Sequence, residues 1–239
     1  MPAMSASYKY GTGVASSVLR DSDDPGGSTS VSTSPQGDSF SILVSETLDT
    51  GHVLNASLSV SLPPQGSSSA ANLVYPTANA SLSHMAFGEW MLPIDGGQEG
   101  GFFAFGAVTP GAAIPTTGSA TYTGAFHAKA FGGSIFFVTA TPIDGSFSAT
   151  ADFAARSVSV TASNPTYASY DFTGTLSYAS GTNQLSGSFS TTSGYSGGAV
   201  ARFFGPAAEE LGGAFQLTRP PSCSLCIRDT YVGSFGAKR

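Results

Sequence analysis

Charged side chains are scarce in this chain. Only 10% of its 239 residues are Asp, Glu, Lys or Arg, against about 25% in ordinary globular domains. Long amphipathic helices present such residues to water, so their scarcity excludes a largely helical fold. The 9 basic residues form no run and the formal net charge is −6. This balance argues against a nucleic-acid partner and against binding to anionic membranes.

Long apolar runs are missing as well. No stretch approaches the roughly 18 uninterrupted apolar residues of a membrane-spanning helix, so we expect no transmembrane span. The first residues, Met-Pro-Ala-Met-Ser-Ala-Ser-Tyr, lack the basic and apolar regions of an export signal. If the protein is exported, we expect its signal to be absent from this chain.

Cysteine and histidine are few. Cys223 and Cys226 stand in Pro-Pro-Ser-Cys-Ser-Leu-Cys. Two thiolates alone do not complete a zinc site, and a redox C-x-x-C normally opens a helix. The sequence therefore predicts a small loop disulfide, with free thiols as the alternative. His52, His84 and His127 have no metal-type spacing, so we expect no metal site, and we expect His127 on the exposed side of a strand.

Glycine, serine, threonine, phenylalanine and tyrosine are abundant instead, with 30 Gly, 17 Phe and 9 Tyr. This mixture suits short strands and tight turns. We expect residues 1–37 to form a loosely held arm with one or two edge strands. Pro110 and Pro115 exclude a central strand between them. Four apolar segments of strand length precede them: Phe40–Val44, Val53–Leu62, Leu82–Leu92 and Gly101–Ala107.

The second half of the chain alternates between apolar and polar residues. Phe147, Ala149 and Ala151 share one face of a strand, for example, with Ser148 and Thr150 on the other. The pattern recurs in about eight segments, the number that closes a small barrel. Eight consecutive antiparallel strands close most simply into an up-and-down barrel, and a two-sheet sandwich is the alternative.

The orientation of the barrel faces follows from the residue types. The apolar face is rich in Gly and Ala, and most segments are about seven residues long, shorter than the 9–11 of a membrane barrel. We therefore expect an apolar interior that buries Phe172, Leu176 and Phe215, with a Ser/Thr face toward water. The segment Val200–Phe204 is ambiguous because both of its registers are apolar.

Two patterns that could suggest catalysis have simpler readings. Gly194–Gly198 fits G-x-S-x-G, but that motif needs a strand–turn–helix context, and here it lies between two strands. Glu209 and Glu210 fall in a strand connection, where Ala207–Leu211 is expected to form one helical turn. No convergent polar groups accompany these residues. We expect no catalytic residues and no enzyme activity.

Three segments of the second half are distinctive. They are Pro-Thr-Thr-Gly-Ser-Ala-Thr-Tyr-Thr-Gly at 115–124, Phe-Phe-Gly-Pro-Ala-Ala-Glu-Glu-Leu-Gly-Gly-Ala-Phe at 203–215 and Gly-Ser-Phe-Gly-Ala-Lys-Arg at 233–239. They resemble the β-barrel domain of the transferrin-binding protein B family of bacterial surface proteins. Phe87–Trp90 and Phe103–Gly106 resemble the strands that lead into that barrel. The resemblance implies an all-β fold with a handle-like antiparallel sheet in residues 1–115, followed by an eight-stranded antiparallel up-and-down barrel in residues 116–239.

The resemblance also implies a function. Members of the family are non-enzymatic binding proteins on the surface of Gram-negative bacteria or released from them. The resemblance therefore implies that this chain captures an iron source, either a host iron protein or haem, for an outer-membrane TonB-dependent transporter. This chain has one lobe rather than two and no lipid-bearing cysteine near its start, and we expect a monomer. The alternatives are a lipocalin-like small-ligand carrier, for which a barrel filled by rings leaves no room, and a structural or adhesive surface module.

Candidate binding residues lie mainly in the first half. His84 is a candidate axial haem ligand, since imidazole binds haem iron. Trp90, the only tryptophan, and Met85 are candidate partner-binding residues, because exposed aromatic side chains anchor interfaces. A core position in the handle is the alternative for Trp90. A second candidate surface is formed by the barrel's end loops near Gly132 or Gly194.

Overall fold

The structure is a computed structural model of the chain. It describes residues 4–11, 14–21, 29–33, 39–47, 53–61, 73–74, 76–94, 97–134 and 136–239, with residues 4–74, 80 and 92–99 described by their backbone. The first eight strands are β1 (Met4–Gly11), β2 (Val14–Asp21), β3 (Thr29–Thr33), β4 (Ser39–Thr47), β5 (Val53–Ser61), β6 (Leu73–Val74), β7 (Met85–Ile94) and β8 (Gly97–Gly106).

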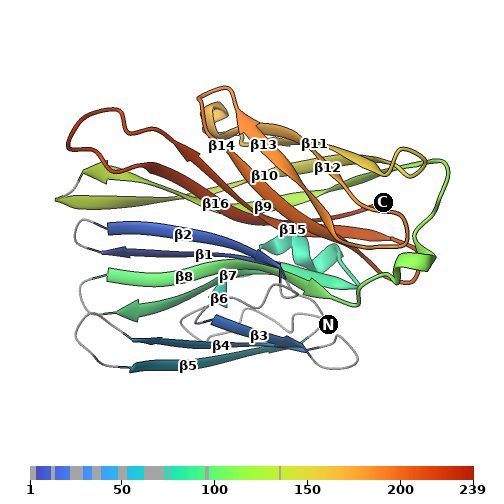
Figure 1. Ribbon diagram of the computed structural model, residues 1–239, viewed down its shortest axis with the longest axis horizontal. Coiled ribbons are helices and arrows are strands. Elements are labelled where there is room, and N and C mark those ends of the chain that lie inside the picture. The colour runs from blue at the N-terminus through green and yellow to red at the C-terminus, as the bar shows by residue number, and fades with distance from the viewer. Residues whose placement is uncertain are drawn as a thin grey trace.

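These strands make two sheets. A five-stranded sheet has the order β2-β1-β8-β7-β6, and a three-stranded sheet has the order β3-β4-β5. The five-stranded sheet, called the handle sheet below, lies between the three-stranded sheet and the rest of the molecule (Figure 1). Residues 1–37 thus supply three strands, not one or two edge strands. β1 is an inner strand of the handle sheet, paired over its length with both β2 and β8.

The second half is a closed eight-stranded antiparallel barrel, as predicted. Its strands follow the order β10-β11-β12-β13-β14-β15-β16-β9. They are β9 (Ser119–Ser134), β10 (Phe137–Asp152), β11 (Ser157–Ser163), β12 (Phe172–Ser177), β13 (Leu185–Thr191), β14 (Ser196–Phe204), β15 (Glu210–Arg219) and β16 (Asp229–Lys238). Three short 3-10 helices, η1 (Thr77–Ser81), η2 (Gly111–Ala113) and η3 (Ala168–Tyr170), lie in connections. None of the helices in the described residues could span a membrane.

Aromatic rings fill the barrel interior. Phe172, Leu176 and Phe215 are buried there, which confirms the predicted orientation. The ring centroids of Phe147 and Phe235 lie 4.4 Å apart in a stacked pair, and Phe172 lies 4.8 Å from Phe215. Such spacing is that of directly packed rings. The interior is a core rather than a ligand chamber.

Glycines on the inner face make room for these rings at some positions and for a neighbouring strand at others. A Cβ at Gly233 would lie 2.7 Å from the ring of Phe215, and a Cβ at Gly174 would collide with the ring of Phe189. At Gly124 and Gly187 the nearest atoms instead belong to the backbone of the neighbouring strand. Those two glycines permit close strand approach and do not accommodate a ring.

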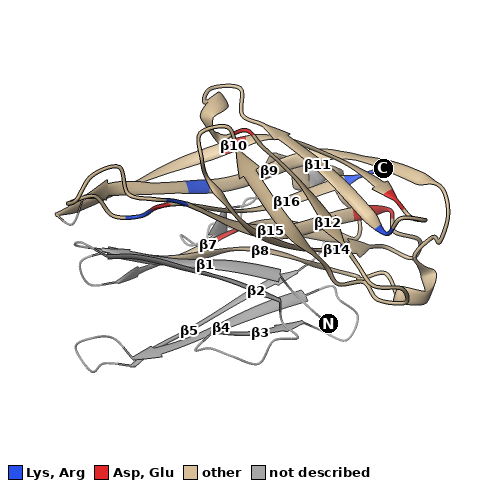
Figure 2. Ribbon diagram, turned by 45° about the horizontal axis from the view of Figure 1, so that its top comes forward, with Lys and Arg blue, Asp and Glu red and all other residues tan. Residues whose placement is uncertain are grey.

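The outside of the barrel has two different walls. The wall formed by β10–β13 carries exposed Ser and Thr side chains, and most of the barrel has neither acidic nor basic residues (Figure 2). The wall formed by β14, β15, β16 and β9 packs against the handle sheet. Phe204, Ala214, Val232 and Phe131 of this wall are buried against Met85, Phe87 and Phe102 of the handle sheet.

This second wall explains the ambiguity of residues 200–204. Ala201 and Phe203 point into the barrel core, whereas Phe204 belongs to the cluster against the handle sheet and Val200 packs on it. Both faces of this strand are covered, so both registers are apolar. A strand covered on both faces loses the alternation typical of a half-exposed sheet.

β9 and β10 are longer than expected. Each has 16 residues, and their far ends form a hairpin that projects beyond the other barrel strands (Figure 1). In this end of β10 the even-numbered Val138 and Ala140 pack toward the handle sheet, whereas in the barrel proper the odd-numbered residues, such as Phe147, are buried. Sequence periodicity therefore recognised only the half of each strand that lies in the barrel proper.

The connection from β14 to β15 is a turn without a helical segment. Gly205 and Ala208 have φ of +85° and +63°, and β15 already begins at Glu210. The predicted helical turn is wrong because the carboxylate of Glu210 accepts the backbone N–H groups of Ser83 (2.6 Å) and His84 (2.9 Å). These bonds hold Glu210 in the sheet. The segment Gly194–Gly198 begins in the turn between β13 and β14, where Gly194 has φ +91°, and continues into β14 from Ser196.

Candidate functional site

Met85 and Trp90 are buried and offer no surface to a partner. Their exposed fractions are 0% and 3%. The Met85 side chain lies against Gly212 of the barrel wall, and the Trp90 indole covers Gly101, its cross-strand neighbour. Glycine at each facing position provides the space for the large side chain. The prediction that Met85 and Trp90 bind a partner is therefore not supported, and Trp90 has the core position given as its alternative.

His84 remains partly exposed, at the junction of β7 with the turn after β14. Its N–H donates to Glu210, and a Cβ at Gly205 would lie 2.8 Å from its ring. No cluster of three or more His, Cys, Asp or Glu in the described part of the chain could hold a metal ion. The role of His84 as a haem ligand stays a prediction.

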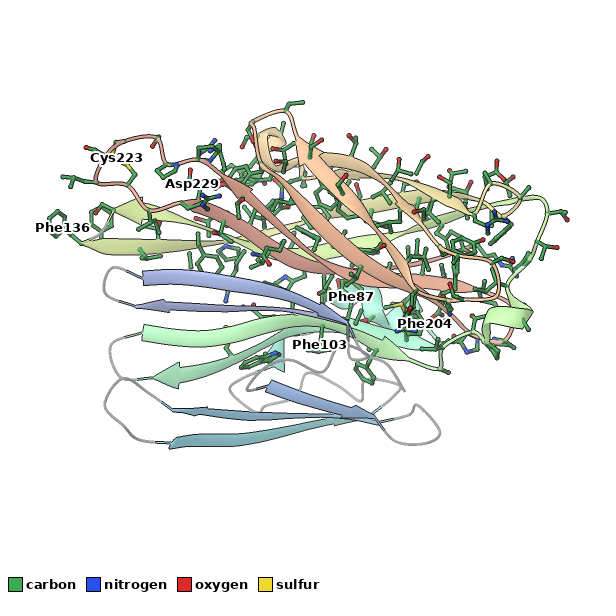
Figure 3. The ribbon with its side chains drawn as sticks, in the orientation of Figure 1. Phe87, Phe103, Phe136, Phe204, Cys223 and Asp229 are labelled. Atoms are coloured by element: carbon green, nitrogen blue, oxygen red, sulfur yellow. A yellow bond between two sulfur atoms is a disulfide. The ribbon has the colours of Figure 1, made fainter. Side chains whose placement is uncertain are left out.

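Exposed large apolar side chains gather at one end of the barrel. Phe136 (73% exposed) and Phe137 (61%) form the tip of the β9–β10 hairpin. Leu225 (52%) lies between β15 and β16, and Tyr167 (48%) lies between β11 and β12. These three connections emerge at the same end, which we call the loop end. Figure 3 shows Phe136 at the tip, with Cys223 beside it.

The loop between β15 and β16 is fastened to the hairpin. Ser134 and Cys226 form an isolated β-bridge, and the N–H of Ile227 donates to the carbonyl of Gly133 at 3.2 Å. The structure contains a disulfide between Cys223 and Cys226, whose Cα atoms are 5.0 Å apart. Leu225 therefore lies in a small disulfide-closed loop that is hydrogen-bonded to the hairpin.

Arg219 joins the remaining parts of the loop end. Its Nη2 and Nε donate to the Asp229 carboxylate at 2.6 and 3.1 Å, and its Nη1 donates to the Ser193 carbonyl at 3.2 Å. The guanidinium also lies 4.7 Å over the Tyr195 ring. The bonds to Asp229 raise the pKa of Arg219, and burial raises the pKa of Tyr195. One side chain thus ties the β13–β14 turn to the start of β16.

A buried charged cluster lies at the junction of the barrel with the handle sheet. Glu89 of β7 is 1% exposed and contacts Lys129 Nζ at 2.5 Å and His127 Nε2 at 3.2 Å. His127 Nδ1 lies 2.5 Å from the Asp144 carboxylate, which is largely exposed. Lys129 also lies 3.0 Å from the Met91 sulfur. We call Glu89, His127, Lys129 and Asp144 the junction cluster.

The position of His127 corrects the expectation that it is exposed. It is 6% exposed because its strand face, polar in pattern, is covered by the handle sheet. Burial alone would lower its pKa, but hydrogen bonds to Asp144 and Glu89 outweigh burial and raise the pKa to about 9. One sequence signal could have found the cluster. Glu89 is a lone carboxylate within an apolar strand, and a buried carboxylate needs a cationic partner.

Comparison with known proteins agrees with this architecture. The family model of the C-lobe and N-lobe β-barrels of transferrin-binding protein B (TbpB) matches residues 114–239, just over half of the chain. No curated protein sequence matches the chain.

Several solved TbpB structures share the fold. TbpB from serogroup B Neisseria meningitidis has a TM-score of 0.56 at 19% identity, covering 99% of this chain and 43% of that one. A double mutant of TbpB from Haemophilus parasuis Hp5 has a TM-score of 0.53 at 15% identity, covering 99% and 44%. A TbpB mutant from Actinobacillus pleuropneumoniae H49 has a TM-score of 0.54 at 14% identity, covering 99% of both chains. The chain thus spans less than half of the two longer structures.

Proposed function

The chain belongs to the family of transferrin-binding protein B β-barrels, and on that premise we propose that it is a non-enzymatic surface binding protein that captures a host iron-carrying protein. Binding takes place at the loop end. The captured protein is then passed to a TonB-dependent transporter of a Gram-negative outer membrane. In this proposal residues 1–115 form the handle domain and residues 116–239 the barrel domain.

The observation that carries the proposal is the position of the exposed apolar side chains. Among the described residues, the four large apolar side chains that are exposed all belong to the loop end. Aromatic side chains that are exposed on a rigid frame are the commonest anchors of protein interfaces. The Arg219–Asp229 pair closes the loop that carries Leu225, and the Ser134–Cys226 bridge joins that loop to the hairpin that carries Phe136 and Phe137. A preorganised surface loses less conformational entropy on binding.

The filled interior separates this proposal from the small-ligand alternative. A lipocalin-like carrier needs a cavity inside the barrel. Here Phe126, Phe147, Phe172, Phe189 and Phe215 are fully buried within it. Recognition is left to the surface, and loops on a rigid scaffold commonly supply it.

Biosensor binding of iron-loaded transferrin to the full chain tests the proposal. Replacing Phe136 and Phe137 together with serine should weaken binding about tenfold to a hundredfold, the loss typical of two interface anchors. Thr175→Ala and Ser188→Ala, on the exposed Ser/Thr wall, serve as matched controls and should bind like the parent. No binding by the parent chain, or equal binding by the serine double variant, would contradict the proposal.

Haemin in the same assay examines the haem prediction. A shifted Soret band that disappears in His84→Ala would identify haem as the ligand and His84 as its contact. The serine substitutions at Phe136 and Phe137 should leave such a band unchanged. That result would replace the protein ligand by haem and move the site from the loop end to the β7 junction.

A further inference from the structure

The connection between β15 and β16 has little besides its disulfide to fix its conformation. It runs between Arg219 and Asp229, which are paired in the sheet and joined by their ion pair. Residues 220–225 are all exposed. A loop without buried apolar side chains gains little from packing to offset the entropy that its backbone loses on ordering. The disulfide and a turn bond from the Cys226 N–H to the Cys223 carbonyl, at 3.2 Å, are therefore the main restraints on this loop.

The same loop fastens the tip of the β9–β10 hairpin. Regular pairing of β9 with β16 ends at Phe131 of β9. Beyond that residue, Ser134 forms an isolated bridge with Cys226, and the N–H of Ile227 donates to the carbonyl of Gly133 at 3.2 Å. A two-stranded hairpin by itself is only marginally stable. The position of the hairpin tip therefore depends on a loop that its disulfide keeps in shape.

The disulfide is open to attack by thiols. Cys223 is exposed and Cys226 is partly exposed, and exposed disulfides are the ones that are most readily reduced. Residues 220–228 contain no carboxylate, and their single charged residue is Arg228. A nearby guanidinium favours the thiolate form of a cysteine. The chain has only two cysteines, so a reductant has no other disulfide to act on.

We propose that the Cys223–Cys226 disulfide is a redox-sensitive clasp of the loop end. Its reduction by a dithiol frees the hairpin tip and weakens binding of the partner, while the barrel stays folded. The effect on binding rests on the proposed function, whereas the effect on the hairpin tip does not.

The reaction is a thiol–disulfide exchange. A thiolate of the dithiol attacks Sγ of the exposed Cys223, the S–S bond breaks, and Cys226 leaves as a thiolate that takes up a proton. The second thiolate of the reductant then attacks the mixed disulfide and releases Cys223, which is protonated in turn. The reductant ends as a disulfide, and the protein has gained two electrons and two protons.

Opening the ring alters the surface that carries the exposed apolar side chains. Leu225 lies inside the ring, and Phe136 and Phe137 form the hairpin tip that the ring fastens (Figure 3). Side chains held in place before binding lose less entropy in the complex, so a freed loop and tip should bind more weakly. None of residues 220–228 belongs to the barrel core, so the core should not change.

Amide hydrogen exchange, measured by NMR before and after reduction with dithiothreitol, tests the clasp without any partner. Exchange should become at least about tenfold faster at Ile227 and at the paired tip residues Gly132 and Thr139, since local opening then costs less. Exchange at Thr175 of β12, in the barrel wall, should not change. Unchanged exchange at the tip after complete reduction would overturn the proposal.

Two variants separate the disulfide from other effects of the reductant. The double variant Cys223→Ser, Cys226→Ser should exchange like the reduced parent and should not respond to dithiothreitol. Ser224→Ala keeps the ring intact, so it is the matched control and should exchange like the oxidised parent. A double variant with the slow exchange of the oxidised parent would contradict the role given to the disulfide.

Biosensor binding of iron-loaded transferrin to the same proteins tests the control of binding. The double serine variant, which needs no reductant, should bind about threefold to tenfold more weakly than the parent and the Ser224→Ala control. Faster exchange at the tip with unchanged binding would overturn the control of binding. A parent chain that does not bind transferrin would contradict the proposed function and this control with it, while hydrogen exchange still decides whether the disulfide holds the hairpin tip.

Discussion

Removal of the Glu89 carboxylate should destabilise the protein strongly. Glu89 is 1% exposed and accepts contacts from Lys129 at 2.5 Å and His127 at 3.2 Å. Glu89→Ala leaves both cations at the junction without this carboxylate. Breaking a buried ion pair by removing one partner costs about 3–5 kcal/mol. For a chain of this length that loss lowers Tm by about 6–20 °C.

Asp144→Ala provides the matched comparison. Asp144 contacts the same His127 at 2.5 Å, but its side chain is 66% exposed, and exposed ion pairs contribute about 0.2–1 kcal/mol. Urea unfolding of both variants at pH 7 measures the two losses. We expect the loss in Glu89→Ala to be several times larger. Equal losses, or a Glu89→Ala variant as stable as its parent, would refute the assignment of the cluster as a buried junction between handle sheet and barrel.

Three further predictions concern the same fold. The pKa of His127 is raised from 6.5 to about 9, so its charged form stabilises the fold fully below pH 6.5 and this stabilisation is lost as pH rises through 9. Urea unfolding should show a loss of about 3 kcal/mol over that interval, absent in His127→Gln. Gly212→Val should lower the free energy of unfolding by about 1–3 kcal/mol because its side chain collides with Met85, and Met85→Ala in the same chain should recover part of the loss. Intact mass after alkylation should show one Cys223–Cys226 bridge, and its reduction should change Tm by no more than a degree or two because so short a ring removes little chain entropy.

Residue pattern alone predicted the barrel well where one face of the wall is wet. Every second residue is buried from Phe147 to Ala151 in β10 and from Val158 to Ala162 in β11, and the alternation expected from sequence is the alternation observed. The aromatic interior followed from the same pattern. The burial of residues in these strands depends mainly on their own side chains and on the adjacent strands, so the sequence of each strand was enough to predict it.

Contacts with a second layer could not be read in this way. The outward face of β9 carries Ala125, His127, Lys129 and Phe131, a mixture that suggests an exposed strand. The handle sheet covers this face of β9. The carboxylate of Glu89, 38 residues before His127 in the sequence, compensates the positive charge of His127. The pattern likewise left Trp90 between a binding surface and the core of the handle, and only the contact with Gly101, which has no side chain, shows the buried site that it fills.

The two walls of the barrel differ in what they contact, and both differ from the loop end. The wall of β14, β15, β16 and β9 packs against the handle sheet. In this wall Gly212 and Gly236 lie opposite each other on neighbouring strands and leave space for the side chains of Met85 and Phe87. The Ser/Thr wall has hydroxyl groups without large apolar anchors, so it contributes little to a tight interface. Among the described residues, only the loop end combines exposed rings with connections fixed by Arg219. A partner is therefore expected to bind where the barrel is neither covered by the handle sheet nor lined only by hydroxyls.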